Sequence, residues 1–504
     1  MKVNINLAAL WVIIASSALL SREFALREYP ASRDILLESK DFSTWGELRK
    51  RAESEFKADG LLFSVSAPTG TDEWTLRADD DAEFFFPPIA AHKPIGVVVY
   101  FLPFTHFAIG KLIDPRDTNW SKYLKSLGRD FTPRDFPKLV RGYLDQEEEN
   151  IRRSVPLTED ALKDYLQSHK NSYPAQKLLA QLKVWRELQK HEKTKRFPIG
   201  EVWRFVIDSD RQDKGPYAFE DEPGYIRGAL NGLAYALQSY NDTGGDAVWY
   251  MNVHDVTVDG AEKQRDKVIE PLEKGYSSRL VAYGFDGLDS DEKGVRDLWE
   301  QQSFFEKRSG DRKNTYVSEG DSGRTSAIVD PVWKKIAQTN PSDQRFVQAA
   351  ELFCRLRKFL TGNPSVPERL MAYLWLAREL EINHFFSDAN GRASNFELLS
   401  MIAKDPDLPM LMFENPNVLD VNGPEKLLVR VLQGMDNFTK NGQAREFELN
   451  NNKMRLQDEK FTDSKVEALR VQLMKFLADD PDRENWSYYH RLMNRAVDKS
   501  CIIL

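Results

Sequence analysis

Residues 384–392, with the sequence HFFSDANGR, bring a base, an acid, a small-residue turn and a cation close together. Transfer of a phosphate-containing group needs this combination, because a hydroxyl nucleophile must lose a proton and the phosphate charge must be neutralised. His384 can accept the proton, and Asp388 can bind a magnesium ion. The backbone N–H groups of Asn390-Gly391 can cradle a phosphate, and the Arg392 guanidinium can pair with its charge. The alternative interpretation is a polar connection between helices that contains a histidine by chance.

The sequence on both sides predicts that this segment lies in a loop between two helices. Residues 365–368, SVPE, are typical of a capping box with a proline in the first helical turn. Apolar residues follow at helical spacing over 370–377 and again over 396–402. Gly391 and Arg392 are therefore expected at the start of the second helix. Unpaired N–H groups and the positive end of the helix dipole favour an anion there.

The segment is similar to the Fic motif, HxFx(D/E)(G/A)N(G/K)R, and the matching residues are His384, Phe386, Asp388, Ala389, Asn390, Gly391 and Arg392. The resemblance covers residues 225–441 and implies a mostly α-helical fold with a Fic-like core, in which the motif joins two helices. It implies that His384 is the catalytic base and Asp388 the metal ligand. The phosphate- and nucleotide-binding residues that it implies are Ala389, Asn390, Gly391 and Arg392.

This resemblance implies transfer of AMP, or a related phosphate-containing moiety, from a nucleotide donor to a Ser, Thr or Tyr hydroxyl of a protein. ATP or another nucleotide is the expected donor, and Mg²⁺ the expected cofactor. One position departs from the family pattern, because Asn395 stands where many nucleotidyl-transferring members carry a second arginine. Asparagine cannot replace a bidentate guanidinium. Two alternatives therefore stay open: phosphocholine or other Fic-type transfer, and a non-catalytic binding module with the Fic fold. Gly391 argues against the phosphorylating branch, which has lysine there.

Upstream of the motif, the sequence predicts a β-hairpin. Two β-prone runs, at Thr315-Tyr316-Val317 and Ala327-Ile328-Val329, flank a turn-rich stretch. The hairpin resembles the Fic flap, which pairs with a target segment and holds its hydroxyl over the active site. Pairing of this kind relies on backbone hydrogen bonds and makes little demand on the target sequence. Thr315, Tyr316 and Val317 are the expected target-docking residues.

The same stretch also fits an inhibitory pattern of the family, (S/T)xxxE(G/N), through Thr315 and Glu319-Gly320. In that pattern a glutamate on a helix competes for the phosphate-binding arginine. Tyr316-Val317 favours a strand and the glycine favours a turn. We therefore interpret Glu319 as part of the flap, with the inhibitory role as the alternative.

The rest of the chain divides by composition and periodicity. The chain has 504 residues with a net charge of −8, and it has no basic stripe that would indicate nucleic-acid binding. Residues 22–223 are expected to form an α+β region of unknown fold. Residues 442–504 are expected to form a helical C-terminal segment. Residues 248–258 are expected to be extended or mixed, and His254 within them is more typical of a structural histidine than of a functional one.

The two termini indicate different compartments. Residues 1–21 have one lysine, an apolar run and small residues, which is typical of a signal peptide or a signal anchor. The last four residues, from Cys501, fit a CaaX box, in which the cysteine is prenylated in a eukaryotic cytosol. The expectations are therefore a secreted or signal-anchored protein, or a protein held at a membrane through lipidated Cys501. Either terminus would give membrane association.

Overall fold

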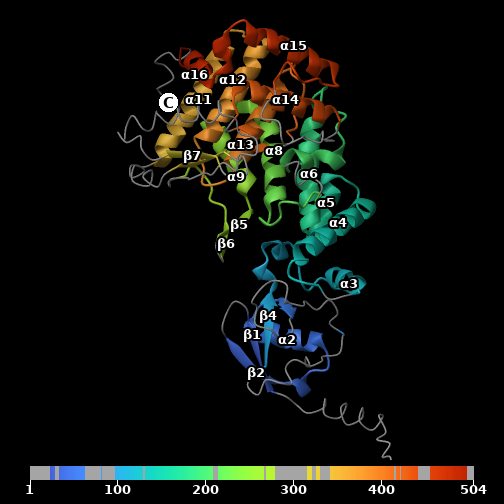
Figure 1. Ribbon diagram of the computed structural model, residues 1–504. Coiled ribbons are helices and arrows are strands. Elements are labelled where there is room, and N and C mark those ends of the chain that lie inside the picture. The colour runs from blue at the N-terminus through green and yellow to red at the C-terminus, as the bar shows by residue number, and fades with distance from the viewer. Residues whose placement is uncertain are drawn as a thin grey trace, which may run out of the picture. The chain divides into compact units, whose positions relative to one another are not determined.

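The computed structural model describes most of the chain in separate ranges. These are residues 23–28, 33–62, 81, 97–128, 131–207, 214–243, 245–265, 268–277, 315–319, 325–329, 341–413, 416–419, 422–440 and 455–495. Within these ranges the chain is mostly α-helical, as the sequence predicts, with an α+β N-terminal part. It divides into two compact units, residues 1–154 with 166–174 and residues 155–165 with 175–504 (Figure 1).

The first unit contains a mixed β-sheet. Its strands and helices are β1 (Glu23–Glu28), β2 (Asp34–Glu38), α2 (Trp45–Phe56), β3 (Gly60–Leu62), β4 (Val97–Pro103), α3 (Thr118–Ser126) and α4 (Phe136–Ser154). The strand order is β2-β1-β4-β3, and only the β1–β4 pair is parallel among these strands. Trp45 and Leu48 of α2 pack against Phe24, Leu26 and Phe101 of the sheet. Within β4, Val99, Tyr100, Phe101 and Leu102 are buried.

The second unit is a helical assembly with two small hairpins. Its elements are α5 (Glu159–Ser168, partly in the first unit), α6 (Tyr173–Gln189), α8 (Tyr225–Thr243), α9 (Ala247–Val258), β5 (Glu262–Arg265), β6 (Val268–Pro271), β7 (Thr315–Glu319), β8 (Thr325–Val329), α11 (Pro341–Leu360), α12 (Val366–Ile382), α13 (Asn390–Lys404), α14 (Pro424–Thr439), α15 (Ser464–Ala478) and α16 (Trp486–Arg495). Short 3-10 helices cover Ser39–Asp41, Phe104–His106, Ala108–Leu112, Ile199–Val206, Pro416–Leu419 and Pro481–Glu484.

The centre of the second unit is the pair α12 and α13. All residues from Leu370 to Ile382 in α12 are buried, as are all residues from Ala393 to Ala403 in α13. A helix that is buried all round must be covered on every side, and α8, α9, α11 and α16 pack against this pair. The loop between α12 and α13 is consequently anchored at both ends in the core.

The expectation for residues 248–258 is wrong, because these residues belong to helix α9. The β-branched residues in VWYMNVHDVTV favour a strand by intrinsic preference. The Asp246 side chain, however, caps the helix by accepting a hydrogen bond from the Trp249 N–H at 2.7 Å. Trp249, Tyr250 and Val253 are also buried in the core. Capping and burial together outweigh the local preference.

The hairpin predicted at 315–329 is present as the antiparallel pair β7–β8. Thr315 pairs with Val329 and Glu319 pairs with Thr325. Glu319 is therefore a strand residue, and the helix that the inhibitory pattern requires is not formed at this position.

Residues 1–22 and 496–504 lie outside the described ranges. The N-terminal signal and the CaaX cysteine Cys501 are therefore left as expectations. Among the residues that the structure does describe, none of the helices combines the length and apolar character needed to cross a membrane.

Candidate active site

The ends of α12 and α13 form as the sequence predicts. The Glu368 carboxylate accepts hydrogen bonds from the backbone N–H and hydroxyl of Ser365 at 2.7 and 2.6 Å, which starts α12. The loop that follows is bounded by two residues with positive φ, His384 at 42° and Ala389 at 60°. This region is sparsely populated by residues with a Cβ atom, so the surroundings must hold the loop in this shape.

Side chains around the loop supply that support. The Asn390 amide bonds to both backbone groups of Phe386, accepting from its N–H at 2.9 Å and donating to its carbonyl at 3.0 Å. The Phe386 ring stacks on the His254 imidazole at a centroid distance of 3.8 Å. Arg345 of α11 donates to the carbonyls of His384 and Phe385 at 3.2 and 3.3 Å. The side chain of Asn390 is thus used to hold the loop. This leaves its backbone N–H as the Asn390 group that can bind an anion at the start of α13.

His384 is held as a neutral imidazole with one tautomer. Its Nδ1 lies 2.6 Å from the carbonyl oxygen of Glu381, and because a carbonyl only accepts, Nδ1 carries the hydrogen. Nε2 is then the basic nitrogen. Burial, assisted by the charge of Arg345 and opposed by the hydrogen bond to the Glu381 carbonyl, lowers the pKa of His384 to about 4. The ring is therefore uncharged at neutral pH and can accept a proton.

Asp388 lies between two cations at the other end of the loop. Its Oδ2 accepts from Nζ of Lys263 at 2.8 Å, and its Oδ1 is 3.3 Å from Nη2 of Arg392. Burial alone would raise the pKa of Asp388, but the charges of Arg392 and Lys263 outweigh burial and hold the pKa below its ordinary value. Asp388 is therefore a carboxylate at neutral pH, which is the form that binds metal ions.

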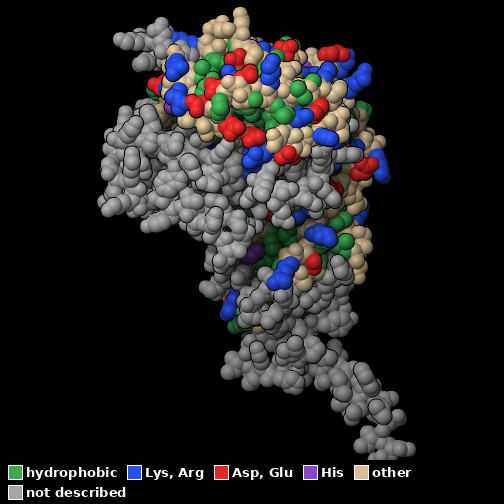
Figure 2. Space-filling view, turned by 45° about the horizontal axis from the view of Figure 1, so that its top comes forward, with side chains coloured by type: hydrophobic (Ala, Val, Ile, Leu, Met, Phe, Trp, Pro, Cys, Tyr) green, Lys and Arg blue, Asp and Glu red, His purple; other side chains and the backbone are tan. Residues whose placement is uncertain are grey.

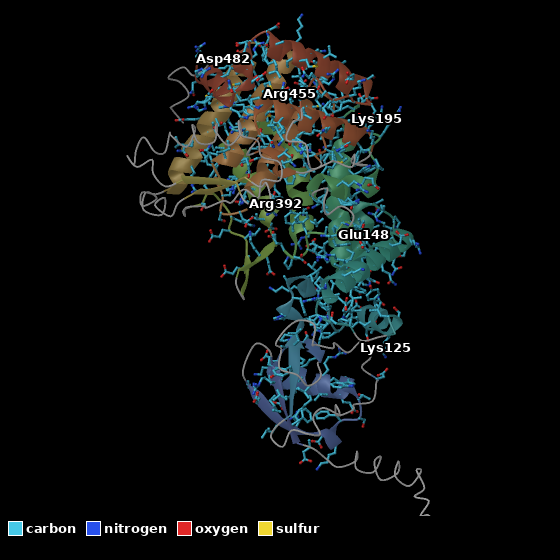
Figure 3. All side chains as sticks on the ribbon, in the orientation of Figure 1. Lys125, Glu148, Lys195, Arg392, Arg455 and Asp482 are labelled. Atoms are coloured by element: carbon cyan, nitrogen blue, oxygen red, sulfur yellow. The ribbon has the colours of Figure 1, made fainter. Side chains whose placement is uncertain are left out.

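Arg392, labelled in Figure 3, lies in the first turn of α13. Its guanidinium lies over the Tyr225 ring at 4.2 Å from the centroid, and its side chain is 10% exposed. Nη1 is buried and has no hydrogen-bond partner in the described part of the chain. The neighbouring N-cap of α13 is Ala389, whose side chain cannot accept from the first-turn N–H groups. A buried unpaired N–H beside an uncapped helix start suits an anion.

His254 supports the site from α9 and is buried. Its Nδ1 is 3.0 Å from the Asp255 carboxylate, and its Nε2 is 3.2 Å from the Asp388 carbonyl oxygen. Burial lowers the pKa of His254, so the ring is neutral and donates its single N–H to one of these oxygens at a time. It braces the backbone at Asp388, which is the structural role that the sequence favours for it.

Lys263 is the site residue that the sequence analysis missed. It is 125 positions before Asp388 and has no motif around it. It reaches the loop because the β5–β6 hairpin folds against it. Ala261 and Leu272, at the two ends of that hairpin, cluster with Val258 and Ala389. Only the three-dimensional arrangement reveals this contact.

The donors suit a magnesium ion that arrives with phosphates, rather than a preformed metal site. No group of three or more metal-binding side chains occurs among the described residues. Mg²⁺ is commonly held by one or two carboxylates together with substrate phosphates and water. Asp388 offers one carboxylate, and the ion would take the place of the Lys263 ammonium. That side chain is 39% exposed and can move aside.

The structure therefore places His384 and Asp388 in the loop between α12 and α13 and Arg392 in the first turn of α13, with Lys263 added from β5. On the face shown in Figure 2, the Lys and Arg side chains of the described residues are interspersed with Asp and Glu. Searches against protein-family models and against curated proteins find no match for the chain.

Proposed function

We propose that this protein is a Fic-type transferase. It moves AMP or a related phosphate-containing moiety from a nucleotide donor, with Mg²⁺, to a Ser, Thr or Tyr hydroxyl of a protein. The observation that carries the proposal is the combination of a neutral, oriented His384 with an Arg392 whose buried Nη1 has no hydrogen-bond partner among the described residues. The first is suited to taking a proton and the second to holding a phosphate.

Donor binding falls to Arg392 and the start of α13. The guanidinium Nη1 and the first-turn N–H groups at residues 390–392 would hold phosphate oxygens with charge-assisted hydrogen bonds. Asp388 would hold the divalent ion, which supplies charge neutralisation on the phosphates. The Arg392 guanidinium makes a cation–π contact with the Tyr225 ring, which restricts the side chain before binding and limits the entropy lost.

His384 would act on the nucleophile. Nε2 takes the proton of the target hydroxyl as its oxygen bonds to the donor's α-phosphorus. The bond from that phosphorus to the bridging oxygen breaks, and with ATP as donor pyrophosphate leaves with the electron pair. The proton then passes from His384 to solvent. Strand β7, through Thr315, Tyr316 and Val317, would pair with the target segment that presents the hydroxyl.

Incubation with labelled nucleotide donors tests this proposal. The purified protein is incubated with Mg²⁺ and labelled ATP in bacterial and eukaryotic extracts, with His384→Ala as the matched control. We expect label on a protein that is absent with the control. If neither ATP nor any other donor labels a protein, itself included, the chain is a non-catalytic module.

A second donor class is favoured by position 395. Asn395 is buried, with 2% of the residue exposed, and offers no cation to a third phosphate. A donor with two phosphates, such as CDP-choline, needs none. Intact-protein mass spectrometry separates the two donors by the added mass, which is that of AMP or that of phosphocholine.

We also propose that the protein acts in an oxidising compartment, which agrees with the signal peptide or signal anchor expected at residues 1–21. Cys354 of α11 is disulfide-bonded, and disulfides are rare in the cytosol. Peptide mapping with and without reductant tests this, because a free Cys354 thiol in protein isolated from cells would overturn the oxidising assignment.

A further inference from the structure

Lys263 lies in the site without belonging to the motif. Its Nζ donates to Oδ2 of Asp388 at 2.8 Å and is 3.9 Å from Oε1 of Glu222. Its side chain is 39% exposed. The Asp388 carboxylate is thus shared between a lysine on one oxygen and Arg392 on the other.

The hairpin that carries Lys263 is fixed at its base. The Glu262 N–H donates to the Pro223 carbonyl at 2.9 Å, and the Leu272 N–H donates to the Ala261 carbonyl at 3.1 Å. Gly224 approaches this base so closely that an added Cβ would lie 2.1 Å from the Gly260 oxygen, and its φ of +82° also favours glycine. Lys263 is therefore positioned by backbone contacts, unlike a lysine on a free surface loop.

The charges around Lys263 change when a divalent ion binds. Lys263 and Arg392 supply two positive charges, Asp388 contacts both of them, and Glu222 lies at the limit of ion-pair distance from Lys263, 3.9 Å. When Asp388 binds a divalent ion, Lys263 loses its hydrogen-bonded acceptor and is repelled by the ion. Glu222 is too far away to replace that hydrogen bond. A phosphate oxygen can then become the acceptor of Lys263.

We propose that Lys263 is the second phosphate-binding cation of this site and the residue that sets how many donor phosphates are recognised. The inference rests on the proposed function. Lys263 moves from Asp388 to a phosphate oxygen beyond the one held by Arg392, which its flexible stem and single point charge allow. It thereby supplies from β5 the charge that Asn395 does not supply from α13.

Nucleotide binding tests this without depending on turnover. In a His384→Ala background, which prevents transfer, the affinities for ATP, ADP and AMP with Mg²⁺ are measured by calorimetry. The variants are Lys263→Ala, Lys263→Gln and Lys263→Arg. The matched control is Lys274→Ala, because Lys274 pairs with Asp259 at 2.7 Å and lies outside the motif loop. Circular dichroism checks that each variant is folded.

We expect Lys263→Ala and Lys263→Gln to weaken ATP binding about tenfold or more, or about 1.4 kcal/mol, and AMP binding much less. Lys263→Arg should restore part of the loss, and Lys274→Ala should change nothing. Unchanged or tighter ATP binding in Lys263→Ala would mean that Lys263 only occupies the metal position, and the inference is then wrong. If the His384→Ala protein with Lys263 intact binds neither ATP nor CDP-choline, the proposed function itself fails, and the inference with it.

Discussion

The two ends of the α12–α13 loop differ in charge although the side chains of His384 and Asp388 are both half-buried. At the first end, His384 is a neutral ring with its Nδ1 hydrogen donated to the Glu381 carbonyl. At the second end, Asp388 is ionised between Arg392 and Lys263. Burial disfavours charge at both ends. At the second end the carboxylate is hydrogen-bonded to its cations, which compensates for burial, whereas at the first end the Glu381 carboxylate lies 4.0 Å from His384 Nε2.

This difference separates two tasks that a transferase must perform. A proton acceptor must be uncharged before it acts, whereas a phosphate site must be charged and must keep donors available. The loop meets both needs over a few residues because its backbone is held at each end by a helix. Changes at the first end should therefore affect the transfer step, and changes at the second should affect donor binding.

The largest effect is expected from His384→Ala. Loss of a general base typically lowers a rate by about 10²–10⁴-fold, while the second end of the loop is left intact. We expect transfer to fall by this factor and the donor Kd to change less than about threefold. Single-turnover labelling and calorimetry measure the two quantities. A large loss of donor affinity would contradict the separation of tasks.

Arg392→Ala should produce the opposite pattern. Removing a charge-assisted hydrogen-bond donor costs about 1.5–3 kcal/mol, so donor affinity should fall by about one to two orders of magnitude. Arg392→Lys should recover little, because an ammonium neither stacks as well on Tyr225 nor offers the forked donor. Equal ATP affinities for Arg392→Ala and the unsubstituted protein would remove Arg392 from the phosphate site.

The substitution Asp388→Asn should lower donor affinity when Mg²⁺ is present and raise it when Mg²⁺ is absent. With Mg²⁺ present, donor affinity should fall about tenfold, because the carboxylate that would hold the ion is lost. Without Mg²⁺, affinity should rise, because Arg392 and Lys263 lose the carboxylate that competes with the donor's phosphates. Titrations with Mg²⁺ and with EDTA make this comparison. The same direction of change in both would argue against Asp388 as metal ligand.

The local sequence is sufficient to predict the motif part of this site. It is not sufficient where long-range packing determines the structure. The α12 start and the His384–Arg392 loop are predictable because caps, turn residues and helix periodicity act over a few positions. The α9 helix is missed because burial of Trp249 and Tyr250 overrides β-branched preference. Lys263 is missed because it lies 125 positions before Asp388 in the sequence, and only the packing of its hairpin brings the two residues together.

The pH dependence of transfer reports the first end of the loop. Transfer needs neutral His384, so kcat/KM should hold as pH falls and decline only as pH passes through about 4. An unperturbed histidine would give a decline near about 6.5. Bound phosphate charge favours the imidazolium, so the decline in kcat, which reports the donor complex, should lie at higher pH than that in kcat/KM. Coincident profiles near 6.5 would mean that burial does not control His384.

The smallest effect is expected from Glu319→Gly, which tests whether a glutamate of this chain inhibits phosphate binding. Such inhibition would require a glutamate carboxylate bound to Arg392. The Nη1 atom of Arg392, however, has no partner in the described ranges, and Glu319 lies in strand β7. We expect self-labelling to change less than about threefold. Glu319→Gln serves as the control, because it removes the charge and keeps a side chain in the strand. An increase of tenfold or more in both variants, about 1.4 kcal/mol in the barrier, would mean that Glu319 obstructs phosphate binding. The second end of the loop would then be closed until a target engages β7.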